Sequence, residues 1–261
     1  MEAVGVIPAR YASSRFPGKP LIDLAGKTMI QRVFENALRA SRLSRVLVAT
    51  DDRRIYDAVM GFCGEAVMTP SDCPSGTDRM ATVARSVDAD LFVNIQGDEP
   101  LIEPDEIDTV IRLLEEDPSA DVATLVKRIA SPSELTSPNT AKVVLDENGY
   151  ALYFSRLPVP AVRGESAPDR ALHTHVYWKH IGIYGYRKPF LMRFAGWRPT
   201  PLECAEQLEQ LRVLEKGGRI RTAETRFEPV CVDTPEDADA VRALLGGSSV
   251  RGGAANAGGP A

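Results

Sequence analysis

The first half of the chain alternates short apolar runs with segments whose apolar residues recur at helical spacing. Strands are predicted at 4–8, 46–50, 65–68, 91–95 and 121–126. Between them, stripes such as Ile30, Val33, Phe34 and Ala37 predict amphipathic helices. Thr28 and Gln31 are spaced as a capping box, and Pro104 opens a further helix.

This alternation predicts a Rossmann-like α/β fold, with a mostly parallel sheet flanked by helices on both faces. In such folds ligands bind beyond the carboxyl ends of the strands. The residues that directly follow each strand are therefore the first candidates for function.

The second half has a different pattern. Two apolar runs at 142–145 and 150–154 flank Glu147–Asn148–Gly149 and predict a β-hairpin. A proline-rich excursion is expected over 157–179, then a strand at 181–186. Thr200, Pro201 and Glu203 predict the start of one helix whose buried stripe is Leu208, Leu211 and Leu214.

A last helix is predicted after Asp233–Thr234–Pro235, and from Gly246 the chain is too poor in apolar bulk to order itself. The predicted organisation is one domain over 1–245 with a smaller β-rich excursion at about 150–200, and a disordered tail over 246–261.

Composition narrows the class of protein. The 261 residues are 44% hydrophobic and 26% charged with a net charge of -5, which argues against nucleic acid as a partner. No apolar run approaches a membrane span and no signal peptide is evident, so no membrane partner is expected. The four cysteines are scattered without a CxxC pair, as is typical of reduced thiols, and a cytoplasmic location is expected.

The loop over 8–21, after the first strand, carries cations and hydroxyls. Arg10, Arg15 and Lys19 lie near Ser13 and Ser14 on a turn-rich segment, without the glycine spacing of a Walker loop or a dinucleotide fingerprint. A triphosphate needs such cations and exposed backbone N–H groups. A solvated basic loop explains the pattern equally well.

Asp98 directly follows a buried strand, at the edge where ligands bind. It lies too far before Pro104 to cap the next helix, which favours magnesium binding over a turn role. Asp233 is ambiguous, since it precedes a helix start that Thr234 could cap in its place.

Other polar residues have ordinary structural explanations. A single histidine beside an apolar run, such as His180, is more often structural than catalytic. Glu206 and Gln210, four apart, are expected on one helix face. The segment Ser75–Arg79 is typical of a helix entry, although it also follows a strand and could face a nucleotide.

The pieces IPARYASSRFPGKPL, ATDD, SGTDRMA, VNIQGDEPLI, KVVLDENGYALYFSR, HIGIYGYR, PLECAEQLEQLRVLE and VDTPEDAD occur in this order. Together they resemble the 3-deoxy-manno-octulosonate cytidylyltransferases, or CMP-Kdo synthetases, from about Val4 to Leu245. The related acylneuraminate enzymes usually carry Gly-Gly-Ser-Lys where this chain has Tyr11–Ser14, which favours Kdo as the sugar.

The resemblance implies that CTP and Kdo react to give CMP-Kdo and pyrophosphate for lipopolysaccharide biosynthesis, in a homodimer built partly from the excursion. It implies Mg²⁺ as the cofactor, with Asp98 and Asp233 as its ligands and Arg10, Lys19 and Asp98 as the catalytic residues. The implied nucleotide-binding residues are Ala9, Arg10, Ser14, Lys19, Ser75, Gly76, Arg79 and Gln96. The implied sugar-binding residues are Arg156, His180, Tyr184, Glu206 and Gln210.

Residues 157–172 match the family poorly, so no role is carried over to them. Two alternatives remain beside this prediction. One is another sugar nucleotidylyltransferase, acting on an acylneuraminate or an amino-Kdo. The other is a nucleotide-sugar binding protein without catalytic activity.

Overall fold

A mixed sheet forms the centre of the computed structural model, which describes residues 1–12, 16–165 and 167–248. Its strands follow the order β3-β2-β1-β4-β8-β5-β9. They are β1 (Ala3–Ala9), β2 (Arg45–Thr50), β3 (Ala66–Met68), β4 (Leu91–Asn94), β5 (Val122–Arg128), β8 (Trp178–Arg187) and β9 (Ile220–Glu224). Only β8 runs antiparallel to its neighbours along this path, between β4 and β5. The predicted α/β fold with a mostly parallel sheet is confirmed.

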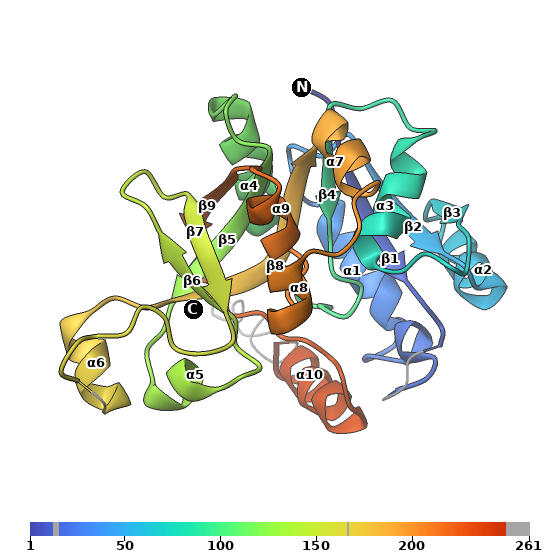
Figure 1. Cartoon of the computed structure of the whole chain (residues 1–261). Coiled ribbons are helices and arrows are strands. Elements are labelled where there is room, and N and C mark those ends of the chain that lie inside the picture. The colour runs from blue at the N-terminus through green and yellow to red at the C-terminus, as the bar shows by residue number, and fades with distance from the viewer. Residues whose placement is uncertain (13–15, 166, 249–261) are drawn as a thin grey trace, which may run out of the picture.

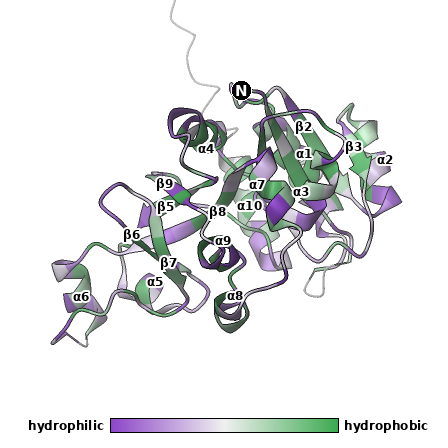
Figure 2. Ribbon diagram, turned by 45° about the horizontal axis from the view of Figure 1, so that its top comes forward, coloured by the Kyte–Doolittle hydropathy of each residue, from purple (hydrophilic) through white to green (hydrophobic). Residues whose placement is uncertain are grey.

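Helices cover both faces of the sheet (Figure 1). One apolar core packs α1 (Met29–Ala37), α2 (Arg53–Gly61) and α4 (Pro104–Glu116) against the strands. The other core holds α3 (Gly76–Ala84), α7 (Lys188–Phe194) and α9 (Leu211–Glu215) on the opposite face. Alternate residues of β1 contribute to the two cores, as a strand buried on both sides requires. Figure 2 shows the resulting concentration of apolar residues in the central strands.

The predicted capping box of α1 is confirmed for only one of its two contacts. The Thr28 side chain accepts from the backbone N–H of Gln31 at 3.3 Å. The Gln31 amide donates instead to Glu35 at 2.9 Å, one helical turn further on. In a full capping box the Gln31 side-chain oxygen would also accept from the backbone N–H of Thr28. The prediction of this second contact was wrong, because pairing with the charged Glu35 turns the amide along the helix.

The excursion leaves the sheet at the lower left of Figure 1. It begins earlier than the predicted 150–200, because it contains α5 (Pro132–Thr136) and the predicted hairpin of β6 (Lys142–Leu145) and β7 (Ala151–Ser155), followed by α6 (Pro168–Thr174). A small apolar cluster joins the helices through Leu135, Ala171 and Tyr177. Strand β6 also pairs with β8, which attaches the hairpin to the main sheet.

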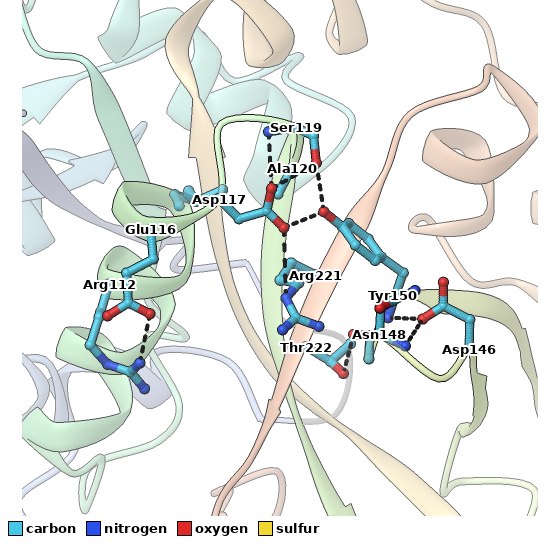
Figure 3. A network of polar contacts seen from close by, with 12 residues as sticks. Arg112, Glu116, Asp117, Ser119, Ala120, Asp146, Asn148, Tyr150, Arg221 and Thr222 are labelled. Atoms are coloured by element: carbon cyan, nitrogen blue, oxygen red, sulfur yellow. Dashed lines mark hydrogen bonds and ion pairs between the residues drawn. The ribbon is translucent and has the colours of Figure 1, made fainter.

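The turn of this hairpin is attached to the far edge of the sheet by a polar network (Figure 3). The Tyr150 hydroxyl donates to Asp117, which follows α4, and its backbone N–H donates to Asp146 at 2.8 Å. Asp117 also lies 3.7 Å from Arg221 of β9. One end of the hairpin is thereby fixed.

The region after Thr200 differs from the single helix predicted there. The capping box of Thr200 and Glu203 is present, but α8 (Pro201–Glu206) ends at Gln207, whose φ is 53°. A second helix, α9, begins four residues later. The expectation that Glu206 and Gln210 share one helix face was therefore wrong, because the left-handed residue between them redirects the chain.

The last helix, α10 (Pro235–Ser248), runs beyond Leu245. The prediction of disorder from Gly246 was thus wrong for 246–248, where the helix continues, and its remainder, 249–261, lies outside the described residues. Lys19–Leu21 form a single 3-10 turn. No helix within the described ranges combines the length and apolar character needed to cross a bilayer.

Candidate active site

The basic loop leaves the carboxyl end of β1 and turns back on itself. The N–H of Gly18 donates to the carbonyl of Tyr11 at 2.8 Å, and Gly18 adopts a φ of 75°, which favours glycine. The neighbouring loop after β4 passes very close. A Cβ at Gly97 would lie 2.8 Å from the carbonyl oxygen of Pro8, so a larger residue there would push the two loops apart.

Lys19 lies between two carboxylates that are distant in sequence. Its ammonium group is 2.7 Å from Asp98 and 3.1 Å from Asp233, and it donates to the carbonyl of Val232 at 3.2 Å. Burial lowers the pKa of Lys19, but the hydrogen bonds and charges of Asp98 and Asp233 outweigh that effect and raise the pKa above its ordinary value. Asp233 is therefore placed beside Asp98, as a shared ligand role would require.

A hollow of about 380 Å³ opens above this cluster. It gathers six of the residues predicted for the nucleotide and the metal. Its lining consists of Pro8, Ala9, Arg10, Ala12, Lys19, Pro20, Gln96, Gly97, Asp98 and Asp233. A hollow of about 410 Å³ beyond β5 and β9 contains none of the predicted residues. Because it gathers the predicted cations and carboxylates, the hollow at Lys19, Asp98 and Asp233 is favoured as the binding site.

The donor set at this hollow suits a magnesium ion. Asp98 and Asp233 both reach one small cation, the Lys19 ammonium group, so their oxygens converge on a common point. Magnesium is usually held by one or two carboxylates and completes its shell with water and phosphate oxygens. Among the described residues no group of three His, Cys, Asp or Glu side chains converges as a fuller metal cage would require.

The segment predicted to lie near cytidine begins α3. The Ser75 side chain caps this helix by accepting from Asp78 N–H at 3.1 Å. A Cβ at Gly76 would lie 3.3 Å from Pro8, so the helix start lies against the end of β1. Arg10 donates to the carbonyl of Cys73, which joins the two predicted nucleotide segments.

Arg79, predicted to bind the nucleotide, does not line the hollow at Asp98. Its side chain is fully buried, donates to Thr69 and lies 3.4 Å from Asp51. Because Asp51 follows β2 and Thr69 follows β3, Arg79 joins the ends of these two strands. Cys73, which Arg10 contacts, lies in the loop that continues from Thr69. Ser14, the remaining predicted nucleotide ligand, lies outside the described residues.

Arg156 and Glu206, two of the predicted sugar ligands, are in direct contact. Glu206 accepts from Arg156 N–H at 2.9 Å and from the Ser155 hydroxyl at 2.8 Å. Burial alone would raise the pKa of Glu206, but these hydrogen bonds lower it below its ordinary value. The Arg156 guanidinium group is occupied by backbone carbonyls, including that of Glu206 at 2.7 Å.

His180 and Tyr184 lie on one face of β8 with their ring centres 5.0 Å apart. Burial lowers the pKa of His180 to about 4, so its ring is neutral near pH 7. The Thr124 hydroxyl has one proton, which the carbonyl of Ile183 accepts at 2.7 Å, so the hydroxyl oxygen is assigned as the acceptor from Nε2 of His180, 3.1 Å away. This assignment leaves Nδ1 as the acceptor.

One contact relates these residues to the nucleotide hollow. The Gln96 amide donates to the carbonyl of Gly182 at 2.9 Å, between His180 and Tyr184 on β8. Gln210, the last predicted sugar ligand, is buried at the start of α9. Neither Gln210 nor the other predicted sugar ligands line the hollow at Asp98.

Sequence reasoning missed a buried carboxylate beside the site, that of Glu99. Burial, and then the charges of Asp98 and Glu106, raise the pKa of Glu99 to about 7. Its Oε1 accepts from the thiol of Cys231 at 3.7 Å. The signal was available, since Glu99 follows Asp98 inside the VNIQGDEPLI piece.

Fold and site together define a nucleotide-binding α/β protein with its cations and carboxylates at the carboxyl edge of the parallel strands. A family model described as cytidylyltransferase matches residues 4–221. The chain belongs to this family of nucleotidyltransferase enzymes.

Two relatives named 3-deoxy-manno-octulosonate cytidylyltransferase match this chain over more than nine-tenths of its length. The one from Trichlorobacter lovleyi is 52% identical over 91% of this chain and 96% of its own length. The one from Syntrophotalea carbinolica is 51% identical over 95% of this chain and 100% of its own.

Among solved structures, CMP:2-keto-3-deoxy-manno-octonic acid synthetase complexed with CTP is 45% identical, with a TM-score of 0.89 over 95% of this chain and 100% of its own. A cytidylyltransferase from Leptospira borgpetersenii, only 14% identical, reaches a TM-score of 0.63 over 94% of this chain and 87% of its own and shares the fold. The resemblance inferred from the sequence motifs is thus confirmed.

Proposed function

We propose that this enzyme transfers CMP from CTP to the anomeric hydroxyl of 3-deoxy-manno-octulosonate (Kdo), giving CMP-Kdo and pyrophosphate. The names of the relatives at about half identity support the substrate pair. The observation that carries the proposal is the Lys19–Asp98–Asp233 cluster, which lies on the cavity at the carboxyl ends of β1 and β4.

The residues on this cavity suit a triphosphate. Arg10 and Lys19 come from the loop after β1 and would neutralise charge on the departing pyrophosphate. Arg10 is held by the Cys73 carbonyl, so it is oriented before the nucleotide arrives. Asp98 and Asp233 would hold Mg²⁺, which when bound supplies positive charge to the phosphate oxygens.

The nucleoside and the sugar would bind on two sides of that cluster. Ser75 and Gly76, at the start of α3 beside Pro8, would approach the cytidine, while buried Arg79 would hold the strand ends beneath it. Arg156, His180, Tyr184, Glu206 and Gln210 would receive the sugar. The neutral His180 ring would accept from a sugar hydroxyl through Nδ1 rather than act as an acid.

The proposal also covers the location of the enzyme, its oligomeric state and the pathway that uses its product. We expect a cytoplasmic homodimer whose interface includes the excursion, and a product that serves lipopolysaccharide biosynthesis. A groove on the excursion, lined mainly by apolar side chains and including Leu157, which is 69% exposed, supports the interface.

The test is pyrophosphate release by the purified protein with Mg²⁺ and Kdo, comparing CTP, UTP, ATP and GTP. We expect release with CTP that requires both Kdo and the metal ion, and none after EDTA is added. Release with an acylneuraminate but not with Kdo would contradict the sugar. No release with any pair would contradict catalysis itself.

A further inference from the structure

Lys142, at the start of β6, has one of the most buried side chains of the protein and no role in the site described above. Its ammonium group donates to the carbonyl oxygens of Ser137 and Thr140, both at 2.7 Å, and of Arg156 at 2.6 Å. An ammonium group has three N–H donors, so all of them are used.

These three bonds fix the backbone on both sides of the predicted sugar site. The loop over 137–141 lies on one side, and the end of β7 lies on the other. The Arg156 guanidinium group reaches the same loop at the Pro138 carbonyl, 3.0 Å away. The loop also accepts the backbone N–H of His180 at the Ala141 carbonyl, 2.9 Å away. Lys142 therefore joins the segments that carry Arg156 and His180.

The charges around Lys142 do not balance. The charge of Glu206 acts on both Lys142 and Arg156, but its oxygens accept from the backbone N–H of Arg156, from Ser155 and from Tyr153 and contact neither cationic group. Within the described part of the chain no carboxylate is in salt-bridge contact with the Lys142 ammonium group. Carbonyl dipoles stabilise a buried cation without neutralising it, and an unpaired buried charge is costly.

Lys179 shows what a merely structural buried lysine looks like in the same sheet. It pairs with Lys142 across β6 and β8 and is also buried. Its ammonium group, however, contacts the carboxylates of Glu134, at 2.5 Å, and Glu228. The neighbouring lysine is neutralised within the protein, whereas Lys142 is not.

We propose that Lys142 is a positioning residue that holds Arg156 in place and adds a buried positive charge, which the carboxylate of the sugar substrate completes. This rests on the proposed function and deepens it, because it assigns the selection of an acidic sugar to a residue that the sugar does not touch. Lys142 and Arg156 lie at the open end of the hairpin of β6 and β7. The turn at the other end is fixed by the Tyr150–Asp117 contact (Figure 3). The bonds of Lys142 therefore set the geometry of the end that carries the two cations.

The experiment compares Lys142→Met with wild type in steady-state kinetics, varying Kdo and CTP separately. Because the variant loses a charge that assists binding of the sugar carboxylate, we expect the KM for Kdo to rise about tenfold or more. The KM for CTP should stay within about twofold, because the triphosphate cavity lies elsewhere. Lys179→Met is the matched control, and its two KM values should change together or not at all.

A second substrate separates charge from simple loss of structure. Wild type should favour Kdo over its uncharged carboxamide, and Lys142→Met should lose most of that preference. If circular dichroism shows that Lys142→Met is unfolded, Lys142→Gln, which keeps a donor without the charge, takes its place. An unchanged preference, or equal rises in both KM values, would overturn the inference alone. A wild type inactive with Kdo and CTP would overturn the proposed function and the inference with it.

Discussion

At the scale of single residues, the contact of Lys19 with two carboxylates makes the strongest prediction. Lys19→Met leaves Asp98 and Asp233 without the cation between them. We expect turnover to fall about 100-fold, as when one donor to developing transition-state charge is removed. Because the two carboxylates then repel each other, Mg²⁺ should raise the melting temperature of the variant more than that of wild type. Initial rates and thermal unfolding with and without Mg²⁺ measure both effects.

Lys27→Met is the matched control for this variant. Lys27 also pairs with a carboxylate, Glu35, but both side chains are well exposed on the surface. Exposed pairs contribute about 0–1 kcal/mol, so activity and the response to Mg²⁺ should match wild type. Wild-type turnover by Lys19→Met would contradict the phosphate role.

The cluster of Lys19, Asp98 and Asp233 shows which site residues could be predicted from their place in the sequence and which could not. Asp98 could be predicted as a metal ligand from its place directly after a buried strand, since ligands bind beyond the carboxyl ends of the strands in a parallel sheet. The place of Asp233 in the chain did not allow this, because helix capping explained it equally well, and only the family resemblance implied a metal role for it. Only the fold brings the loops of residues 98 and 233 together, and the backbone bond from Val232 N–H to the Asp98 carbonyl, 2.9 Å, makes the contact direct.

At the scale of elements, the short helices α8 and α9 are joined by one ion pair. Glu203 caps α8 by accepting from Thr200 N–H at 3.0 Å, and it also accepts from Nε of Arg212 in α9 at 2.7 Å. Replacing Glu203 by glutamine takes from the buried guanidinium group the nearer of its two carboxylates, since Glu209 lies 3.9 Å away. We expect the free energy of unfolding to fall by about 3 kcal/mol, measured by urea denaturation.

Glu215→Gln tests whether this loss depends on burial. Glu215 also links the two helices, by accepting from Leu202 N–H at 3.0 Å, but it is exposed. Its substitution should lower the free energy of unfolding by less than about 1 kcal/mol. Similar losses in the two variants would contradict the importance of the buried pair.

Elements with strong local patterns were predictable, and those set by tertiary contacts were not. The strands of the first half are continuous apolar runs, and Pro104 marks the start of α4. The break at Gln207 had no sequence signal, because a glutamine rarely adopts a positive φ without help from its surroundings. Strand β9 was missed because Arg221 and Glu224 interrupt its apolar pattern, and it is recognisable only by its pairing with β5.

At the scale of the whole molecule, the excursion presents an apolar surface that no other part of the described chain covers. A groove of about 330 Å³ lies there, lined mainly by apolar side chains from the loop over 157–162, α5 and α6. Leu157, on its rim, is among the most exposed large apolar residues described. Soluble proteins seldom leave such a surface open unless it binds a partner. Because the same hairpin carries Arg156, an interface there would support the sugar site as well.

If the proposed homodimer uses this surface, Leu157→Asp should separate it into monomers, since the new carboxylate would be buried without a cation. Sedimentation velocity should show wild type as a dimer and this variant as a monomer at the same concentration. Leu38→Asp, which replaces another leucine that is more than half exposed but lies just after α1, should remain a dimer. Because the hairpin is also joined to α8 through Arg156 and Glu206, we expect the monomer to keep its affinity for CTP while the KM for the sugar rises. A dimeric Leu157→Asp variant would place the interface elsewhere, and a monomeric wild type would contradict the homodimer itself.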